Sequence, residues 1–151
     1  MININVIVKE KKWLNFLKNP ENYLKKKIKK IQNDKFFKKN IKFNFCILLS
    51  NSSSIRLLNK KFRKKNKSTD VLSFPFYEKK KLDKIIKKEK EIYLGDIIIN
   101  YSKLKKNSEK KQFIKHLDKL WVHALLHLFG HKHGKNLDFK RMNILEKKFL
   151  N

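Results

Sequence analysis

Hydrophobic and polar positions alternate along several segments of the chain in the way that β-strands require. Residues 2–8 are rich in β-branched side chains, and residues 41–49 alternate apolar and polar positions, so both segments are predicted strands. Two further strands are expected at residues 71–76 and 92–100. Gly95, inside the last of these, indicates a bulge or the close approach of another backbone.

Other segments carry apolar residues at spacings of three and four, which predicts amphipathic helices between and after the strands. Asn19–Pro20 is typical of a helix start, and Asn51 or one of the serines at 52–54 can cap a second helix. A long helix, with a break near residues 107–108, is expected to end at Gly130. Asn136 can cap the last helix.

Residues 78–91 contain almost no apolar side chains, and they are expected to form an exposed, partly helical connection. Strands and helices follow one another without strict βαβ alternation, which is typical of an α+β fold. The sequence therefore predicts one domain over residues 1–151, with a small mixed sheet of about four strands packed by helices.

Composition excludes several classes of protein. The chain has 151 residues, 40% of them hydrophobic, which is too apolar for a disordered basic tail. Its single cysteine, Cys46, excludes an internal disulfide framework and a zinc site of the CxxC type. No apolar run approaches the length of a membrane span, so a cytosolic protein is expected.

The formal net charge of +27 indicates a polyanionic partner such as a nucleic acid. However, only three of the 40 basic residues are arginine, and a lysine-rich composition with many asparagines and isoleucines is also typical of A/T-rich coding sequence. In such a composition, an arginine indicates a functional or structural need more strongly than a lysine does.

The candidate chemistry lies in a cluster of histidines. His123 and His127 are four residues apart, so on a helix both imidazoles project from one face and can share a metal ion. Gly130 ends the helix and allows His133 to return as a third ligand, with His131 as the alternative. Three protein ligands leave one zinc coordination position open, as in catalytic sites.

The spacing of these histidines equals that of the metzincin proteases, whose pattern is H-E-x-x-H-x-x-G-x-x-H. In those proteases the glutamate takes a proton from the metal-bound water. This chain has Ala124 at that position, so a zincin-like peptidase is disfavoured although the metal-binding spacing is retained.

Together with other motifs, this cluster resembles the rRNA maturation factor YbeY family, which are metal-dependent endoribonucleases of bacteria. The family's histidine motif appears here as HALLHLFGHKH at residues 123–133. Its other motifs appear as LNKKFR at 58–63, TDVLSFP at 69–75 and GDIII at 95–99, and the tail from Met142 to Glu146 also agrees. The resemblance covers nearly the whole chain.

Three positions depart from the family pattern: Ala124 replaces a glycine, His131 a tyrosine, and Lys132 an aspartate. Alanine in place of glycine is mild if the position lies within a helix. The loss of the aspartate removes a carboxylate and adds a positive charge near the histidines. Since all three histidines are present, we expect a diverged member that is still functional.

The resemblance implies roles for individual residues. The three matching histidines, His123, His127 and His133, are expected to bind one divalent metal ion, with zinc as the expected ion. Arg63 matches the arginine needed for cleavage, and a guanidinium suits support of a phosphate. Independently of the resemblance, His116 lies seven residues before His123 on the same helical face, which makes it a candidate for proton transfer or RNA contact, or else a partly buried polar residue.

The resemblance further implies a single-strand-specific endoribonuclease in 16S rRNA 3′-end maturation and ribosome quality control. Its partners would be single-stranded RNA, the small ribosomal subunit and assembly factors, and the protein is expected to be a cytoplasmic monomer without a membrane partner. The alternative is a non-catalytic ribosome-assembly or RNA-binding factor in which the metal is structural. Asp70 and Ser73 are expected to organise the strand end beside the site.

Overall fold

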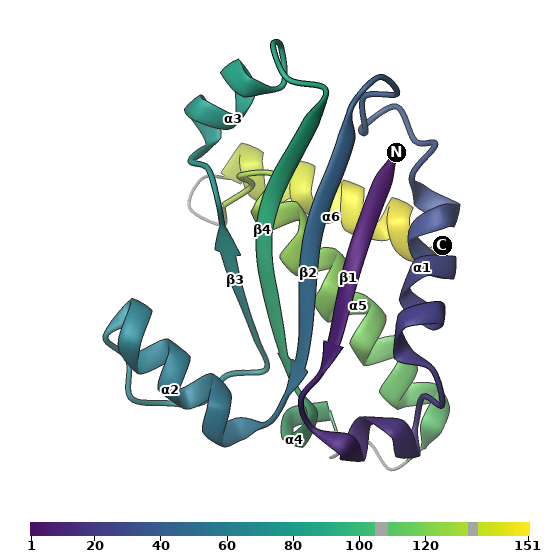
Figure 1. The fold of residues 1–151 in the computed structure, drawn as a ribbon, viewed down its shortest axis with the longest axis vertical. Coiled ribbons are helices and arrows are strands. Elements are labelled where there is room, and N and C mark those ends of the chain that lie inside the picture. Colours follow the sequence, from purple (N-terminus) through teal and green to yellow (C-terminus); the bar gives the residue numbers. More distant parts are fainter. Residues whose placement is uncertain (105–108, 133–135) are drawn as a thin grey trace.

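The strands of the chain form one mixed sheet, as seen in a computed structural model that describes residues 1–104, 109–132 and 136–151 (Figure 1). Its order is β1-β2-β4-β3, in which β1, β2 and β4 are parallel and β3 pairs antiparallel with β4 at the edge. The bounds are β1 Ile2–Val8, β2 Lys42–Ser50, β3 Val71–Pro75 and β4 Glu91–Asn100. The predicted α+β fold with a small mixed sheet is confirmed.

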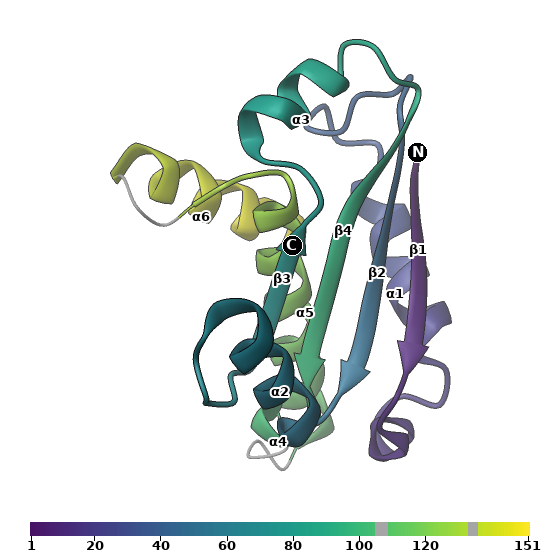
Figure 2. The same ribbon diagram turned by 60° about the vertical axis from the view of Figure 1, so that its left-hand side comes forward.

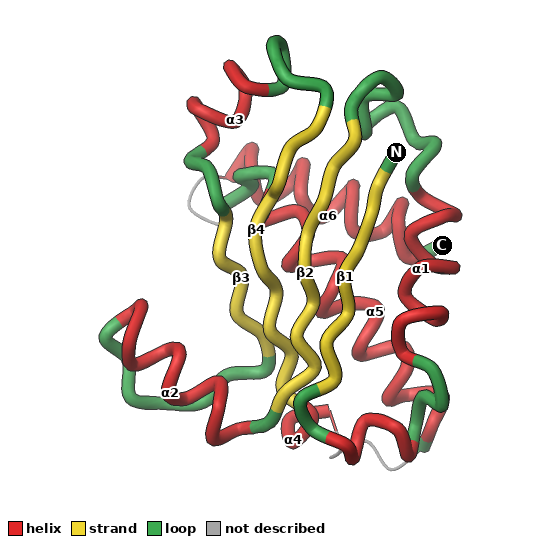
Figure 3. The backbone as a smooth tube through the Cα atoms, in the orientation of Figure 1, coloured by secondary structure: helices red, strands yellow, loops and turns green. Residues whose placement is uncertain are grey.

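Three helices, α1, α5 and α6, lie on one face of this sheet, whereas α2 lies beside β3 towards the other face (Figures 1 and 3). The helical segments are η1 Lys11–Asn15, α1 Pro20–Ile31, α2 Ser52–Arg63, α3 Lys79–Ile85, α4 Tyr101–Leu104, α5 Lys110–Leu128 and α6 Asn136–Leu150. None of the described helices is both long enough and apolar enough to cross a membrane.

The predicted helix caps are present at the amino ends of α1 and α2. The side chain of Asn19 accepts a hydrogen bond from the backbone N–H of Asn22 at 2.9 Å, and that of Asn51 accepts one from Ser54 at 3.1 Å. Gly130 follows α5 with a φ of +85°, as a residue after a helix end often does. The break predicted near residues 107–108 and the cap predicted for the side chain of Asn136 lie outside the described residues.

The hydrophobic core lies between the sheet and the three helices. Alternate residues of β2, from Phe43 to Leu49, point towards α5 and are at most 1% exposed. They pack in one cluster with Leu117 and Leu125 of α5. Burial of each such side chain contributes about 1.5–3 kcal/mol to stability. This core fixes α5 against the sheet, and α5 carries the histidine pair.

Gly95 confirms the expected bulge and close approach. In β4, Leu94 is an extra residue between the partners of Asn44 and Phe45, so the register shifts by one position. Gly95 has a φ of +132°, and a Cβ there would lie 2.1 Å from the carbonyl oxygen of Phe74. Glycine is therefore required for β3 to pair closely with β4.

Two short segments show the limits of the periodic pattern. The connection at residues 78–91 contains α3, which is anchored by Leu82 at 1% exposure. Before α1 the chain forms η1, which the pattern did not predict. There Trp13 is fully buried and donates from Nε1 to the carbonyl oxygen of Ser50 at 3.1 Å. Each segment is held by a few apolar side chains, with Ile85 and Ile86 beside Leu82 and with Phe16 and Leu17 beside Trp13, and so few residues give no clear periodicity.

Candidate metal centre and active site

His123 and His127 lie one turn apart near the carboxyl end of α5, as their spacing predicts. Their Nε2 atoms are 3.0 Å apart, and the imidazole planes meet at 76°. Both side chains are partly buried, so the two nitrogens converge at a point that solvent can still reach. Side chains four residues apart on a helix meet in this way because they project from the same face.

The other ring nitrogen of each histidine is held by an acceptor. Nδ1 of His123 lies 2.5 Å from Oε1 of Glu146 on α6, and Nδ1 of His127 lies 2.7 Å from the carbonyl oxygen of His131. A carbonyl oxygen can only accept, so the proton of neutral His127 is on Nδ1 and the Nε2 lone pair faces His123. Metal-ligating histidines are typically held by a carboxylate or a carbonyl in this way.

The donor set fits a divalent metal ion. Two imidazole nitrogens bound to one tetrahedral zinc at 2.0–2.1 Å would be separated by about 3.3 Å, which is close to the observed 3.0 Å. Among the described residues, no group of three histidine, cysteine or carboxylate side chains is placed to hold an ion. His133, the predicted third ligand, lies outside the described residues.

His131, the alternative third ligand, is used differently in the structure. Its carbonyl oxygen accepts from His127, while its ring is half-buried with its centre 5.9 Å from that of Phe36. Burial lowers the pKa of His131, and the nearby charge of Lys79 adds to the effect. The backbone of His131 thus orients the neighbouring histidine, and its ring packs against an aromatic side chain.

A cavity of about 300 Å³ opens in front of the two histidines. Its lining consists of six residues from α2, β3 and α5: Arg63, Val71, Ser73, His123, Ala124 and His127. Figure 2 shows how these elements meet, with β3 at the edge of the sheet and α5 crossing behind it. Arg63 comes from a motif about 60 residues before the histidines, and the fold brings it into the same cavity.

The guanidinium of Arg63 is held in place by β3. Its Nη2 donates to the carbonyl oxygen of Ser73 at 3.1 Å, and its Cζ lies 5.9 Å from the centre of the Phe74 ring. That hydrogen bond uses one of the five N–H groups of the guanidinium. The side chain is exposed on the cavity side, so it is placed to meet an anionic group there.

The chain between α2 and β3 is fixed by polar side chains, and this positions Arg63. The side chain of Asn59 is 3% exposed and donates to the carbonyl oxygen of Lys67 at 2.8 Å. The buried amide of Asn100 donates to the carbonyl oxygen of Thr69 at 2.9 Å. Asp70 accepts from the backbone N–H of Val71 at 2.9 Å, in agreement with an organising role at the strand end.

His116 and Ala124 occupy different parts of the same helix. His116 lies two turns before His123, which corresponds to about 10 Å along the axis, and it is not among the described residues that line the cavity. Its role therefore stays a prediction.

Ala124 is buried within α5, where alanine in place of glycine favours the helix. Glu146 matched the family only as part of the tail from Met142 and was given no role, because its partner His123 is 23 residues away.

Comparison with known proteins agrees with this architecture. Residues 7–151 match the family model described as Endoribonuclease YbeY. The chain is 42% identical to Endoribonuclease YbeY of Pelagibacter ubique, covering 94% of this chain and 90% of that protein. It is 36% identical to that of Ehrlichia canis, covering 99% and 91%. The solution structure of TM1509 from Thermotoga maritima covers 99% of this chain and 87% of that one, with a TM-score of 0.55 and 27% identity.

The fold and the site define the class of protein: an α+β domain in which a helix against the sheet carries a histidine pair. The chain belongs to the YbeY family, as its motifs indicated. The sequence resemblance is confirmed over most of the chain.

Proposed function

We propose that this protein is a metal-dependent endoribonuclease that cleaves single-stranded RNA. The observation that carries the proposal is the convergence of the two Nε2 atoms beside Arg63 in one cavity, in a chain of the YbeY family. We further propose that His123, His127 and His133 hold the ion, that zinc is the ion, and that the substrate is the 3′ end of small-subunit rRNA.

Each described residue at the cavity has a physical task in this reaction. His123 and His127 present Nε2 lone pairs because Glu146 and the carbonyl of His131 hold their Nδ1 atoms. A divalent ion held by these nitrogens would supply Lewis acidity towards the scissile phosphate or would acidify a bound water. Arg63 binds the same phosphate and stabilises the negative charge that grows in the transition state.

The lining of the cavity argues against a peptidase. Ala124 occupies the position at which metzincins carry their catalytic glutamate, and none of the described lining residues is acidic. The carboxylate of Glu146 lies behind His123, where it orients the ring. We propose that His116, about 10 Å along the helix, contacts RNA outside the cavity rather than moving a proton within it.

The formal charge of +27 suits an extended phosphodiester backbone and predicts binding that weakens as salt rises. We propose that the protein acts as a monomer in the bacterial cytoplasm, on rRNA of the small ribosomal subunit and together with its assembly factors.

The decisive test of this function replaces Arg63 by alanine and compares it with a matched variant on the same helix. Arg56 is that control, because its Nε donates to Asn66 at 2.9 Å and it does not line the cavity. We expect Arg63→Ala to lower the rate of single-stranded RNA cleavage about 10²–10³-fold. Its RNA affinity should change little, since many other basic residues remain, and Arg56→Ala should cleave normally.

Cleavage by Arg63→Ala at the wild-type rate would overturn the role of Arg63. A metal-loaded wild type that binds rRNA fragments without cleaving any of them would instead favour the assembly factor with a structural metal.

A further inference from the structure

The face of the sheet opposite α1, α5 and α6 is only partly covered. Among the described helices, α2 packs on this face, where Ile55 meets Leu72 and Ile98. The pairing register places Asn3, Asn44 and Tyr93 in one row across the remaining part of the face. A second row consists of Asn5, Cys46, Asp96 and Phe74. These two rows therefore carry asparagines on β1 and β2, and the aromatic rings of Tyr93 and Phe74 beside Asp96 on β4 and β3.

The aromatic residues of this region are unusually exposed. Phe62 is 58% exposed, Phe76 63% and Tyr93 38%. They form edge-to-face pairs, with ring centres 5.2 Å apart for Phe62 and Phe74 and 5.7 Å apart for Phe76 and Tyr93. Clustered exposed aromatic side chains typically mark an interaction site, because their burial in the fold would otherwise be favourable.

The bulge at Gly95 helps to build this cluster. Because Leu94 is an extra residue in β4, Tyr93 and Asp96 lie on the same face although they are three apart in sequence. The hydroxyl of Tyr93 donates to Oδ1 of Asp96 at 2.6 Å, which fixes the orientation of the phenol ring. Burial and the acceptor Asp96 raise the pKa of Tyr93, so its ring stays uncharged at neutral pH.

Arg63 links the aromatic cluster to the catalytic cavity around the edge strand β3, since Val71 and Ser73 line the cavity while Phe74 lies on the opposite face of the strand. Arg63 lines the cavity and at the same time lies over the ring of Phe74, whose backbone neighbour Ser73 also lines it. Phe74 and Phe76 are two residues apart in and just after β3, so the cluster extends along β3 away from the cavity.

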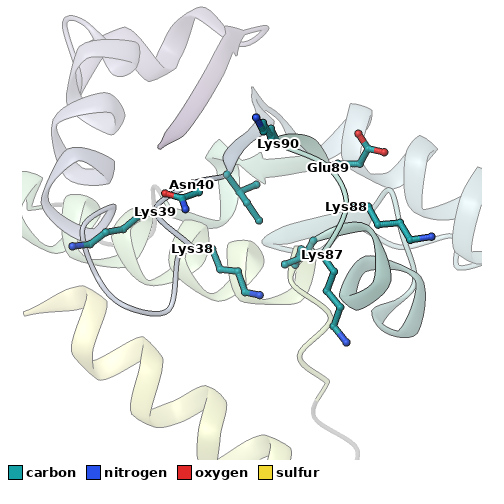
Figure 4. A pocket seen from close by; sticks show the side chains of 9 residues that line it. Lys38, Lys39, Asn40, Lys87, Lys88, Glu89 and Lys90 are labelled. Atoms are coloured by element: carbon teal, nitrogen blue, oxygen red, sulfur yellow. The ribbon is translucent and has the colours of Figure 1, made fainter.

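Positive charge accompanies the aromatic rings at both ends. Nζ of Lys61 lies 5.3 Å from the ring centre of Phe62, and Nζ of Lys81 lies 5.6 Å from that of Tyr77. Beyond them, the turns before β2 and β4 line a cavity of about 580 Å³ with five lysines and one acidic residue: Lys38, Lys39, Lys87, Lys88, Lys90 and Glu89. Figure 4 shows these lysines pointing outwards in different directions, which suits diffuse attraction of a phosphodiester backbone.

We propose that Phe62, Phe74, Phe76 and Tyr93 form a stacking surface for unpaired bases of the RNA strand whose phosphate occupies the catalytic cavity. Unpaired bases stack on aromatic side chains regardless of sequence, and basic residues around the rings neutralise the backbone. Asp96 and the exposed asparagines of β1, Asn3 and Asn5, would then lie beside the stacked bases. This inference rests on the proposed endoribonuclease function. It adds a second region that contacts the RNA, beside the cavity that holds the scissile phosphate.

The test uses variants of the two most peripheral rings, Phe76→Leu and Tyr93→Leu, because neither ring fills the core. The affinity for a single-stranded RNA of about twelve nucleotides should fall roughly tenfold in each variant. Cleavage of an oligonucleotide of about four nucleotides, which fills little more than the cavity, should be unchanged. Phe76→Trp should bind this RNA at least as tightly as the wild type, because tryptophan retains an aromatic ring on which a base can stack, whereas leucine does not.

A fluorescent base analogue in the longer RNA reports stacking directly: its emission should be quenched by the wild type and by Phe76→Trp, and less by Phe76→Leu. Ile144→Ala, which removes a 66% exposed apolar side chain on α6, is the control and should behave as the wild type. Equal RNA affinity and equal quenching in all variants would overturn the proposal, and would favour a protein partner for this face. Stacking without cleavage by the wild type would support the surface while overturning the proposed nuclease function.

Discussion

Glu146 gives a prediction that depends on the geometry of the metal centre alone. Its carboxylate lies 2.5 Å from Nδ1 of His123, and the side chain is only 13% exposed. It therefore fixes the ring plane and holds a proton on Nδ1, which leaves Nε2 directed at His127. Removal of such a partner lowers metal affinity about 10–100-fold, which corresponds to about 1.4–2.8 kcal/mol.

Two substitutions separate charge from orientation. Glu146→Gln retains an oxygen that can accept from Nδ1 but loses the negative charge, so zinc affinity should fall about tenfold. Glu146→Ala loses both, so affinity should fall about a hundredfold. The assay is competition for zinc with a chelator of known affinity, and it requires no RNA.

The control for both variants is Glu21→Gln, because Glu21 pairs with Lys25 on the exposed side of α1, away from the histidines. It should leave zinc affinity unchanged. Denaturant unfolding of the metal-free variants and wild type shows whether the loss of the contact between Glu146 and His123 also destabilises the fold. Zinc affinity of Glu146→Ala within about twofold of the wild type, in a folded protein, would refute this reasoning.

Three further predictions concern stability, and each is measured by denaturant unfolding. Gly95→Ala should lower the free energy of unfolding by at least about 3 kcal/mol, because its Cβ would overlap the carbonyl of Phe74; a loss under 1 kcal/mol would show that β3 can shift without penalty. Asp118→Asn should lower it by about 2–3 kcal/mol, because three side-chain donors converge on this buried carboxylate; an unchanged midpoint would contradict that. The ion pair with Lys148 lowers the pKa of Asp34, so its stabilisation is present above about pH 4 and is lost as the pH falls through the lowered pKa. Asp34→Asn should accordingly lower stability by about 1 kcal/mol at pH 7 and have no effect near pH 2; an equal effect at both values would exclude the charge as the cause.

Local signals in the sequence predicted those features that local physics determines. The alternation of apolar and polar residues predicted the strands, and the capping residues Asn19 and Asn51 predicted where two helices begin. The spacing of His123 and His127 predicted that both side chains lie on one face of a helix. A glycine inside a strand indicated a bulge or a close backbone approach, and Gly95 provides both. In each case the cause lies within a few residues of the effect.

Contacts between distant segments could not be predicted in this way. Glu146 meets His123 across two helices, and no spacing in the sequence encodes that contact. The entry of Arg63 into the histidine cavity followed only from the family resemblance, and its cause is the polar network around Asn59 and Asn100. The exposed pair of Phe76 and Tyr93 likewise forms only when β3 pairs with β4.

The positions that depart from the family pattern are compatible with the site. Ala124 lies within α5, and Lys132 is exposed. His131 retains the backbone contact to His127 whatever its side chain. None of the three replacements therefore removes a described contact that holds His123 or His127.

The most direct test of this account measures metal content and RNA cleavage on the same samples of the wild type and His127→Ala. We expect about one divalent ion per chain in the wild type, with ion and cleavage lost together in the variant. Full cleavage by metal-free wild type, or by His127→Ala without its ion, would contradict the assignment of the histidine pair as the catalytic metal centre.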